Sequence, residues 1–279
     1  MRENILLVSL LFMFGLSSSA QKMKVEDVIA KHLDSVGTTE NRDKIKNQTI
    51  LGTVSFALAL DKNSLYNGKC VLASDMGKRL FGMAFNTDVY PFEKISYDED
   101  KLKIAFIRVG SRSALGSYLF RYEGIIKQGL LGGAIFNKWA LNNLSASKAK
   151  IELKGTKKID GKESYVIGFS PKKGFGVEIS LFFDVTTFQH IRTEYRSEIG
   201  AQLGPTPGLS SNQSETRELL IEIFSDFKVE NNLTLPHKYK INYLVSGRNT
   251  KEYNYNFELN GFYFNQDLQP NTFDIEAKQ

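Results

Sequence analysis

The sequence predicts a mainly β domain, in which one curved antiparallel sheet carries helices against its concave side. Two observations lead to this fold class. From Thr49 onward, apolar and polar residues alternate with a period of two in many short segments. Between Thr49 and residue 108, polar or Gly-containing turns separate these segments, and no stretch long enough for a crossover helix joins them, which argues against βαβ units. We expect about ten strands in one sheet.

Residues 1–20 (MRENILLVSLLFMFGLSSSA) have the three parts of a cleavable signal peptide, with a cut before Gln21. The apolar run from Ile5 to Leu16 is short for a membrane span, although a retained N-terminal anchor is the alternative. No Cys stands at the cleavage point, so the signal is not of the lipoprotein type. We expect a soluble periplasmic monomer in which residues 21–279 form a single domain.

The first element of that domain should be an amphipathic helix that ends at Gly37. Its apolar residues recur every three or four positions: Val25, Val28, Ile29, His32, Leu33 and Val36. A second short helix should follow at about 40–46.

The first strand should start near Thr49, with Ile50, Val54, Phe56, Leu58 and Leu60 on one face and small residues on the other. The same reasoning predicts strands at about 66–74, 78–86, 92–97, 101–108, 148–158, 162–170, 177–184, 187–197, 216–229, 234–246 and 251–264. A Gly/Pro/Ser-rich loop at 200–214 interrupts the series.

The stretch 110–147 breaks the strand pattern and predicts two short apolar helices joined by a Gly-rich bend. It combines large apolar residues, among them Leu130, Leu131, Ile135, Phe136 and Trp139, with four glycines: Gly124, Gly129, Gly132 and Gly133. Because glycine accepts backbone angles that other residues avoid, the segment could serve as a hinged lid over an apolar cavity. The alternative is that it completes an ordinary core.

The net charge is +5, and the segment 138–173 accounts for the excess with nine Lys against Glu152, Asp160 and Glu163. We interpret its alternating lysines as a solvated outer strand face, with docking to an anionic membrane or an acidic partner as the alternative. Nucleic acid is not an expected partner. Because Cys70 is the single cysteine, the chain cannot form an intrachain disulfide. We expect Cys70 to be a small buried side chain.

No motif in the sequence indicates catalysis, a cofactor or a metal site. The three histidines (His32, His190 and His237) lie far apart in the chain and form no HExxH or His-x-Glu motif. The sequence contains no GxSxG elbow, no dinucleotide-binding glycine pattern and no phosphate-binding loop. We therefore expect a protein that is not an enzyme and has no cofactor.

Several segments resemble the outer-membrane lipoprotein carrier and lipoprotein-sorting superfamily of LolA/LolB-like proteins. They are VEDVIAKHLDSVGTTENRDKIKNQTILGTV, GLLGGAIFNKWAL, GKESYVIGFSPKKGFGVEISLFFDVTTFQHIRTEYR, FSDFKVENNLTLPHKYKI and NGFYFNQDLQPNTFDI, and together they span most of residues 25–275. The resemblance implies an incomplete β-barrel, covered by helices, whose apolar cavity holds acyl chains in transit. It also implies a transfer arginine, for which Arg79, Arg108, Arg112 and Arg121 are candidates.

The function that follows is a periplasmic carrier or binding protein that sequesters lipid or lipoprotein acyl chains in an apolar cavity. Val54, Phe56, Leu58 and Leu60 are expected to form its wall, and Leu130, Leu131, Ile135, Phe136 and Trp139 its lid. The alternative is an envelope module that uses the same fold to sense or bind outer-membrane or other envelope proteins without lipid transport. An enzyme acting on envelope lipids or glycans is a third hypothesis.

Overall fold

A computed structural model of the chain describes residues 23–59, 65–98, 101–200 and 215–275. The predicted signal peptide (1–20), Leu60 and most of the 200–214 loop lie outside the described residues. In the part that is described, no helix is long and apolar enough to cross a membrane.

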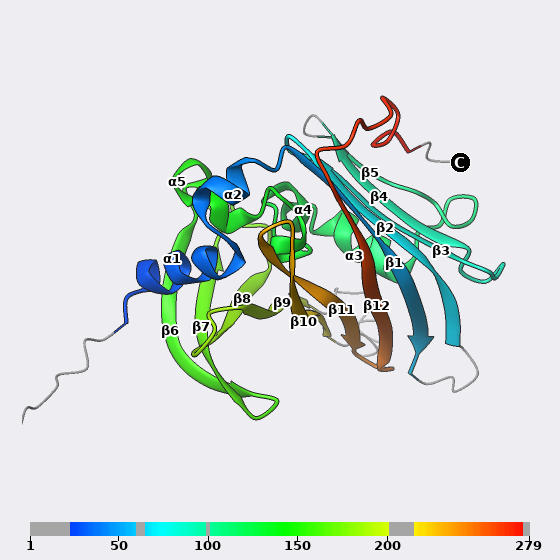
Figure 1. Ribbon diagram of the computed structural model, residues 1–279. Helices are drawn as coiled ribbons and strands as arrows, with labels where there is room; N and C mark the ends of the chain where they lie inside the picture. The colour runs from blue at the N-terminus through cyan, green and yellow to red at the C-terminus, as the bar shows by residue number, and fades with distance from the viewer. Residues whose placement is uncertain (1–22, 60–64, 99–100, 201–214, 276–279) are drawn as a thin grey trace, which may run out of the picture.

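Within these ranges, twelve strands form one sheet in which every neighbouring pair is antiparallel. The order across the sheet is β5-β4-β3-β2-β1-β12-β11-β10-β9-β8-β7-β6. Because β5 and β6 are at the two edges, the sheet curls without closing (Figure 1). The strands are β1 (Asn47–Leu58), β2 (Leu65–Asp75), β3 (Lys78–Phe85), β4 (Phe92–Asp98), β5 (Lys101–Ile104), β6 (Lys150–Ile159), β7 (Lys162–Ser170), β8 (Glu178–Asp184), β9 (His190–Ile199), β10 (Thr216–Glu230), β11 (Leu233–Ser246) and β12 (Lys251–Phe264).

The predicted fold class is confirmed, and each segment expected to be a strand contains one. The expected count of about ten was low, since the sheet has twelve strands. The fifth strand is shorter than expected because the chain turns back after Ile104: the Ile107 amide donates to the Ser111 carbonyl at 2.9 Å. In the 184–187 turn, Asp184 accepts hydrogen bonds from the backbone amides of Thr186 and Thr187, both at 2.9 Å.

Segment 110–147 is more fragmented than the two helices that the sequence predicts. It contains α3 (Ala114–Arg121), α4 (Gly124–Lys127), two 3₁₀ turns, η1 (Gly133–Ile135) and η2 (Ala140–Asn143), and α5 (Leu144–Ser147). Gly129, Gly132 and Gly133 have φ angles of 74°, 78° and 51°. These left-handed conformations suit glycine and interrupt the helix in the middle of the segment.

The N-terminal helices lie against the limb of the sheet that contains β6 (Figure 1). They are α1 (Val25–Val36) and α2 (Thr39–Asp43). On α1, the Nδ1 atom of His32 hydrogen-bonds to the Phe188 carbonyl at 2.8 Å, and its ring meets Trp139 edge-on at 4.7 Å. Burial lowers the pKa of His32 to about 4, although the Phe188 hydrogen bond acts the other way, so the ring is neutral at pH 7.

Helices α3 and α4 lie inside the curve of the sheet and connect its two limbs (Figure 1). Arg79 of β3 donates to the carbonyl oxygens of Ile126 and Lys138 at 2.5 and 2.8 Å. From the other limb, Glu222 of β10 accepts from the Gly132 amide at 2.6 Å. One apolar cluster therefore includes side chains of both limbs and of the segment between them.

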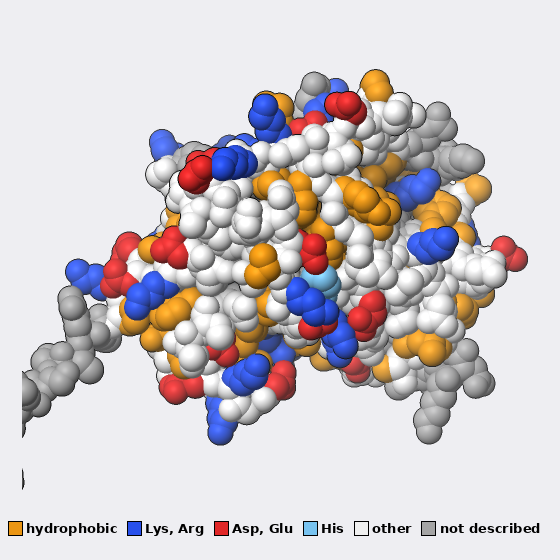
Figure 2. Space-filling model, in the orientation of Figure 1, with side chains coloured by type: hydrophobic (Ala, Val, Ile, Leu, Met, Phe, Trp, Pro, Cys, Tyr) orange, Lys and Arg blue, Asp and Glu red, His pale blue; other side chains and the backbone are white. Residues whose placement is uncertain are grey.

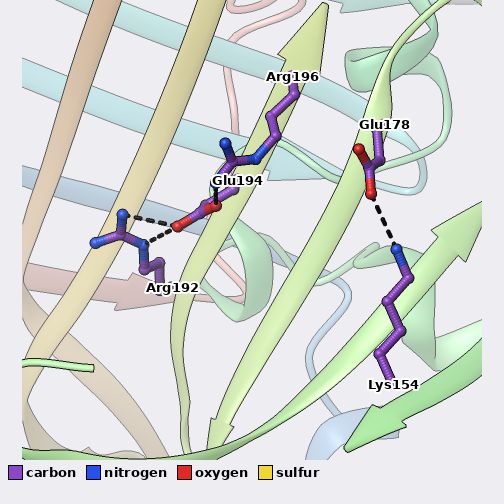
Figure 3. Close-up of polar contacts among 5 residues, drawn as sticks. All are labelled: Lys154, Glu178, Arg192, Glu194 and Arg196. Atoms are coloured by element: carbon purple, nitrogen blue, oxygen red, sulfur yellow. Dashed lines mark hydrogen bonds and ion pairs between the residues drawn. The ribbon is translucent and has the colours of Figure 1, made fainter. Parts of the chain in front are cut away.

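The outer face of the limb that contains β6, β8 and β9 carries charged side chains that form ion pairs (Figure 3). Arg192, Glu194 and Arg196 follow one another at alternate positions of β9, and Glu194 pairs with both arginines. Partial burial acts to raise the pKa of Glu194, but the Arg196 hydrogen bond and the Arg192 charge lower it overall. Lys154 of β6 pairs with Glu178 of β8 at 3.0 Å. The lysines at alternate positions of β6 are exposed, as expected for an outer strand face.

Candidate functional site

A cavity of about 310 Å³ lies at the end of the concave face where β1 finishes and β2 and β12 begin. We call it the aromatic cavity. Five of its lining side chains are aromatic rings: Phe56, Tyr66, Tyr90, Tyr253 and Tyr255. Its volume is within the range of about 300–1,000 Å³ that is common for small-molecule sites.

Strand register explains why these rings converge. Phe56 is the cross-strand partner of both Tyr66 on β2 and Tyr255 on β12. Partners in an antiparallel pair point to the same face of the sheet. The Phe56 ring is 4.8 Å from the Tyr255 ring and 4.8 Å from the ring of Tyr90, which follows β3. Phe56 is therefore the centre of the aromatic wall.

One side of the cavity is polar and is built around the buried carboxyl group of Glu93. The Tyr90 hydroxyl donates to Glu93 Oε2 at 2.6 Å, and the Ser113 hydroxyl donates to the same oxygen. The Tyr255 hydroxyl lies 3.3 Å from that of Tyr90. Burial raises the pKa of Glu93 to about 7, and the hydrogen bonds from Ser113 and Tyr90 oppose that rise. Tyr90, Ser113 and Tyr255 line the cavity, so Glu93 holds its polar edge in place.

Basic and exposed apolar residues surround the mouth of the cavity. Arg112 lines it, and its guanidinium lies over the rings of Phe106 and Phe120 at 4.4 and 4.1 Å. Val89, also in the lining, is 57% exposed, and Val109 in the nearby 107–111 turn is 87% exposed. Exposed apolar side chains beside a cavity are typical of a surface that meets an apolar partner.

The structure does not bring the predicted wall and lid residues around one cavity. Phe56 and Leu58 line the aromatic cavity, whereas Val54 is buried deeper in the core. The five predicted lid residues, Leu130, Leu131, Ile135, Phe136 and Trp139, are all at most 5% exposed and belong to the main core cluster. In the described part of the chain, small voids of about 10 and 30 Å³ lie beside Phe136. In this conformation, segment 110–147 is packed as core.

Of the four candidate arginines, Arg112 is the one that lines the aromatic cavity. Arg108 lies near the mouth, with its guanidinium 3.4 Å from the Val89 carbonyl. Arg112 also donates from Nε to the Ile104 carbonyl at 3.2 Å. Arg79 and Arg121 have structural contacts and are not among the residues that line the cavity. Arg79 holds the backbone of segment 110–147, and Arg121 pairs with the buried carboxylate of Glu218 at 2.7 Å.

Sequence reasoning missed the buried carboxyl groups of Glu93, Glu218 and Glu222. Glu222 accepts hydrogen bonds from Tyr195 at 2.6 Å and from Tyr239 at 2.5 Å, and burial raises its pKa to about 7. The sequence did contain an indication of the buried glutamates on β10. Glu218 and Glu222 alternate with the same spacing as Leu220 and Phe224, so all four side chains point to the core. In the described part of the chain, His, Cys, Asp and Glu side chains form no group that could hold a metal ion.

Comparison with known proteins gives structural matches only. No family model and no curated protein matches the sequence. A LolA superfamily protein from Nitrosomonas europaea aligns over 91% of this chain and 98% of its own, at 10% identity and a TM-score of 0.45. A putative outer membrane lipoprotein-sorting protein domain from Vibrio parahaemolyticus covers 90% of this chain and 97% of its own, at 10% identity and a TM-score of 0.46.

A DUF1329 family protein from Desulfovibrio piger aligns over 91% of this chain and 99% of its own, at 11% identity and a TM-score of 0.43. These matches include the superfamily that the sequence resembles, and they extend over nearly the full length of each chain. At such identities and TM-scores they carry no residue roles across, so the functional argument rests on the cavity itself.

Proposed function

We propose that this protein is a periplasmic carrier or binding protein that shelters the acyl chain of a lipid or lipoprotein, without chemical conversion. The observation that carries the proposal is the aromatic cavity, because Phe56, Leu58 and four tyrosines enclose a ligand-sized apolar space beside exposed apolar residues. Each acyl methylene buried there would contribute about 0.8 kcal/mol.

The polar groups of the cavity would orient the ligand. An acyl chain would lie against Phe56 and Leu58, and its ester, amide or acid head would meet Arg112 at the mouth. Arginine suits this position because its planar guanidinium can donate two parallel hydrogen bonds to a carboxylate or phosphate. Segment 110–147 would have to move out of the core before Trp139 or Phe136 could contact a long chain.

The experiment is lipid extraction and mass spectrometry of the protein purified from the periplasm of a bacterial host. Ala114 lines the cavity, so Ala114→Trp should fill it and reduce the recovered acyl lipid about tenfold. Ser117→Trp is the matched control, since Ser117 is exposed on the same helix, α3. Thermal unfolding of both variants shows whether each is folded.

Absence of acyl lipid from the wild-type preparation, or equal amounts in the two tryptophan variants, would contradict the carrier proposal. It would favour an envelope interaction or sensor module with the same fold. The specific observation behind this second candidate is the packing of Leu130, Ile135 and Trp139, which are at most 3% exposed, and of which Trp139 borders a small void of about 30 Å³ among the residues that the structure describes.

A further inference from the structure

The outer face of β1–β4 carries a larger hollow, of about 470 Å³, on the opposite side of the sheet from the aromatic cavity. We call it the outer groove. From Leu80 onward, the outward residues of β3 are apolar and their side chains are small after the first: Leu80, Gly82 and Ala84. Leu51 of β1 and Val71 of β2 form one side, and Leu51 is 40% exposed. The convex face of such a sheet is ordinarily polar, so this apolar hollow is a candidate binding surface.

Small side chains and the C-terminal segment create the hollow. Gly82 pairs with Val71, and a Cβ atom on Gly82 would come within 2.9 Å of the Val71 side chain. At the other end, the chain after β12 crosses over the sheet: Ser96 of β4 donates a hydrogen bond to the Phe273 carbonyl, and Ile275 is buried against the groove. Among the described residues, the groove is therefore closed at its Leu80 end and open at its Ala84 end, where Ala84 is exposed.

Two lysines flank the open end. Lys69 of β2 is the register partner of Ala84, and Lys94 of β4 is the register partner of Gly82, so both border the same short stretch of β3. Among the described residues, neither ammonium group lies within ion-pair distance of a carboxylate. Asp274 also lines the groove, but it is paired with Lys103. In Figure 2, hydrophobic and basic side chains lie together over β2, β3 and β4.

We propose that the outer groove is a second binding site, independent of the aromatic cavity, for a free fatty acid. The alkyl chain would lie along β3 from Ala84 toward Leu80, with its end against Ile275. The carboxylate would sit at the open end between Lys69 and Lys94. Charge complementarity selects an anionic head, and a single groove along one strand selects a single chain. From Leu80 to Ala84 the strand spans roughly 14 Å, which matches a medium-length alkyl chain.

The test is methyl NMR of the wild-type protein, titrated with laurate. Laurate should shift the methyl signals of Leu80 and Ile275 in the groove. The methyls of Leu58 and Ile107 report separately on the aromatic cavity, so failure of one site is distinguishable from failure of the other. Lauryl alcohol has the same alkyl chain and no charge, so its Kd at the groove should be about tenfold higher than that of laurate.

Variants test the positions of the alkyl chain and of the carboxylate of laurate separately. Ala84→Trp should weaken laurate binding at the groove at least tenfold, and Asn67→Trp, exposed two positions before Lys69 on β2, should leave it within twofold. If Ala84→Trp does not fold, Leu51→Glu places a negative charge in the same groove and should weaken laurate binding at least tenfold. Lys69→Gln with Lys94→Gln should weaken laurate about tenfold and leave lauryl alcohol unchanged. The control is Lys150→Gln with Lys157→Gln on exposed β6.

Three results would overturn the proposal. The first is the absence of laurate-dependent shifts at Leu80 and Ile275. The second is unchanged laurate affinity in the Ala84→Trp variant, or in the double variant of Lys69 and Lys94. The third is binding of lauroyl lysophosphatidylglycerol at the groove without binding of laurate, which would assign the site to a phospholipid.

Discussion

Replacing Glu222 by Gln should make the stability of this protein less dependent on pH. The Glu222 carboxyl is fully buried and accepts hydrogen bonds from Tyr195, Tyr239 and the Gly132 amide. Glutamine has nearly the same shape and is always neutral, so its carbonyl can keep the Gly132 and Tyr239 contacts while its amide donates to Tyr195. The substitution therefore removes the ionisation and retains most of the packing.

The magnitude follows from the pKa of this carboxyl group, which burial raises from 4.5 to about 7. Between these two values the folded protein holds more protons than the unfolded chain, so the free energy of unfolding falls as the pH rises. The stabilisation that protonated Glu222 provides is present in full below the unfolded-state pKa, and it is lost above the folded-state pKa. From about pH 5 to about pH 8.5, Glu222 alone should account for a loss of about 2.5 kcal/mol.

The assay is urea unfolding at both pH values, followed by the fluorescence of Trp139, which is the only tryptophan. The stability of the Glu222→Gln variant relative to wild type should be greater at pH 8.5 than at pH 5 by about 2.5 kcal/mol. Comparing variant with wild type cancels the opposite pH dependence that buried, neutral His32 and His190 impose. Glu93→Gln should behave in the same way, because burial also raises the pKa of Glu93 to about 7.

The control is Glu152→Gln, which changes an exposed carboxylate on β6 and should shift stability equally at both pH values. A difference between Glu222→Gln and wild type that is the same at pH 5 and pH 8.5 would refute the reasoning. It would mean that Glu222 is already ionised in the folded protein at the lower pH.

Three further predictions concern the core. Trp139→Ala should lower the free energy of unfolding by about 3–5 kcal/mol in urea titrations, since Trp139 is buried between α1 and β9; a change below about 1 kcal/mol would contradict core packing. Gly132→Ala should cost about 1–3 kcal/mol, because φ is 78° there and a Cβ would approach the Phe136 ring, whereas exposed Gly174→Ala should be nearly neutral by the same measurement. Cys70, whose pKa burial raises to about 12, should resist thiol reagents at neutral pH until urea unfolds the protein; rapid labelling of the native state would show that it is accessible.

The strands and their inward faces were predictable from the sequence. When apolar and polar residues alternate with a period of two, the apolar side chains share one face of the strand. Ile50, Val54 and Phe56 are buried as that pattern requires. Glu218 and Glu222 have the same parity signal, but a charged residue among apolar neighbours does not reveal that tyrosines from other strands will hydrogen-bond to it.

Tertiary structure alone decided where the cavities are. Periodicity assigns a side chain to a face of the sheet, but whether that face borders a space depends on which other segment packs against it. Phe56 and Leu58 line a cavity because the chain around Tyr90 and Ser113 covers β1 incompletely, whereas Trp139 and Leu130 are held in the core by contacts from both limbs of the sheet. The outer groove likewise exists because residues 272–275, remote in sequence from β3, cross over one end of its apolar outer face.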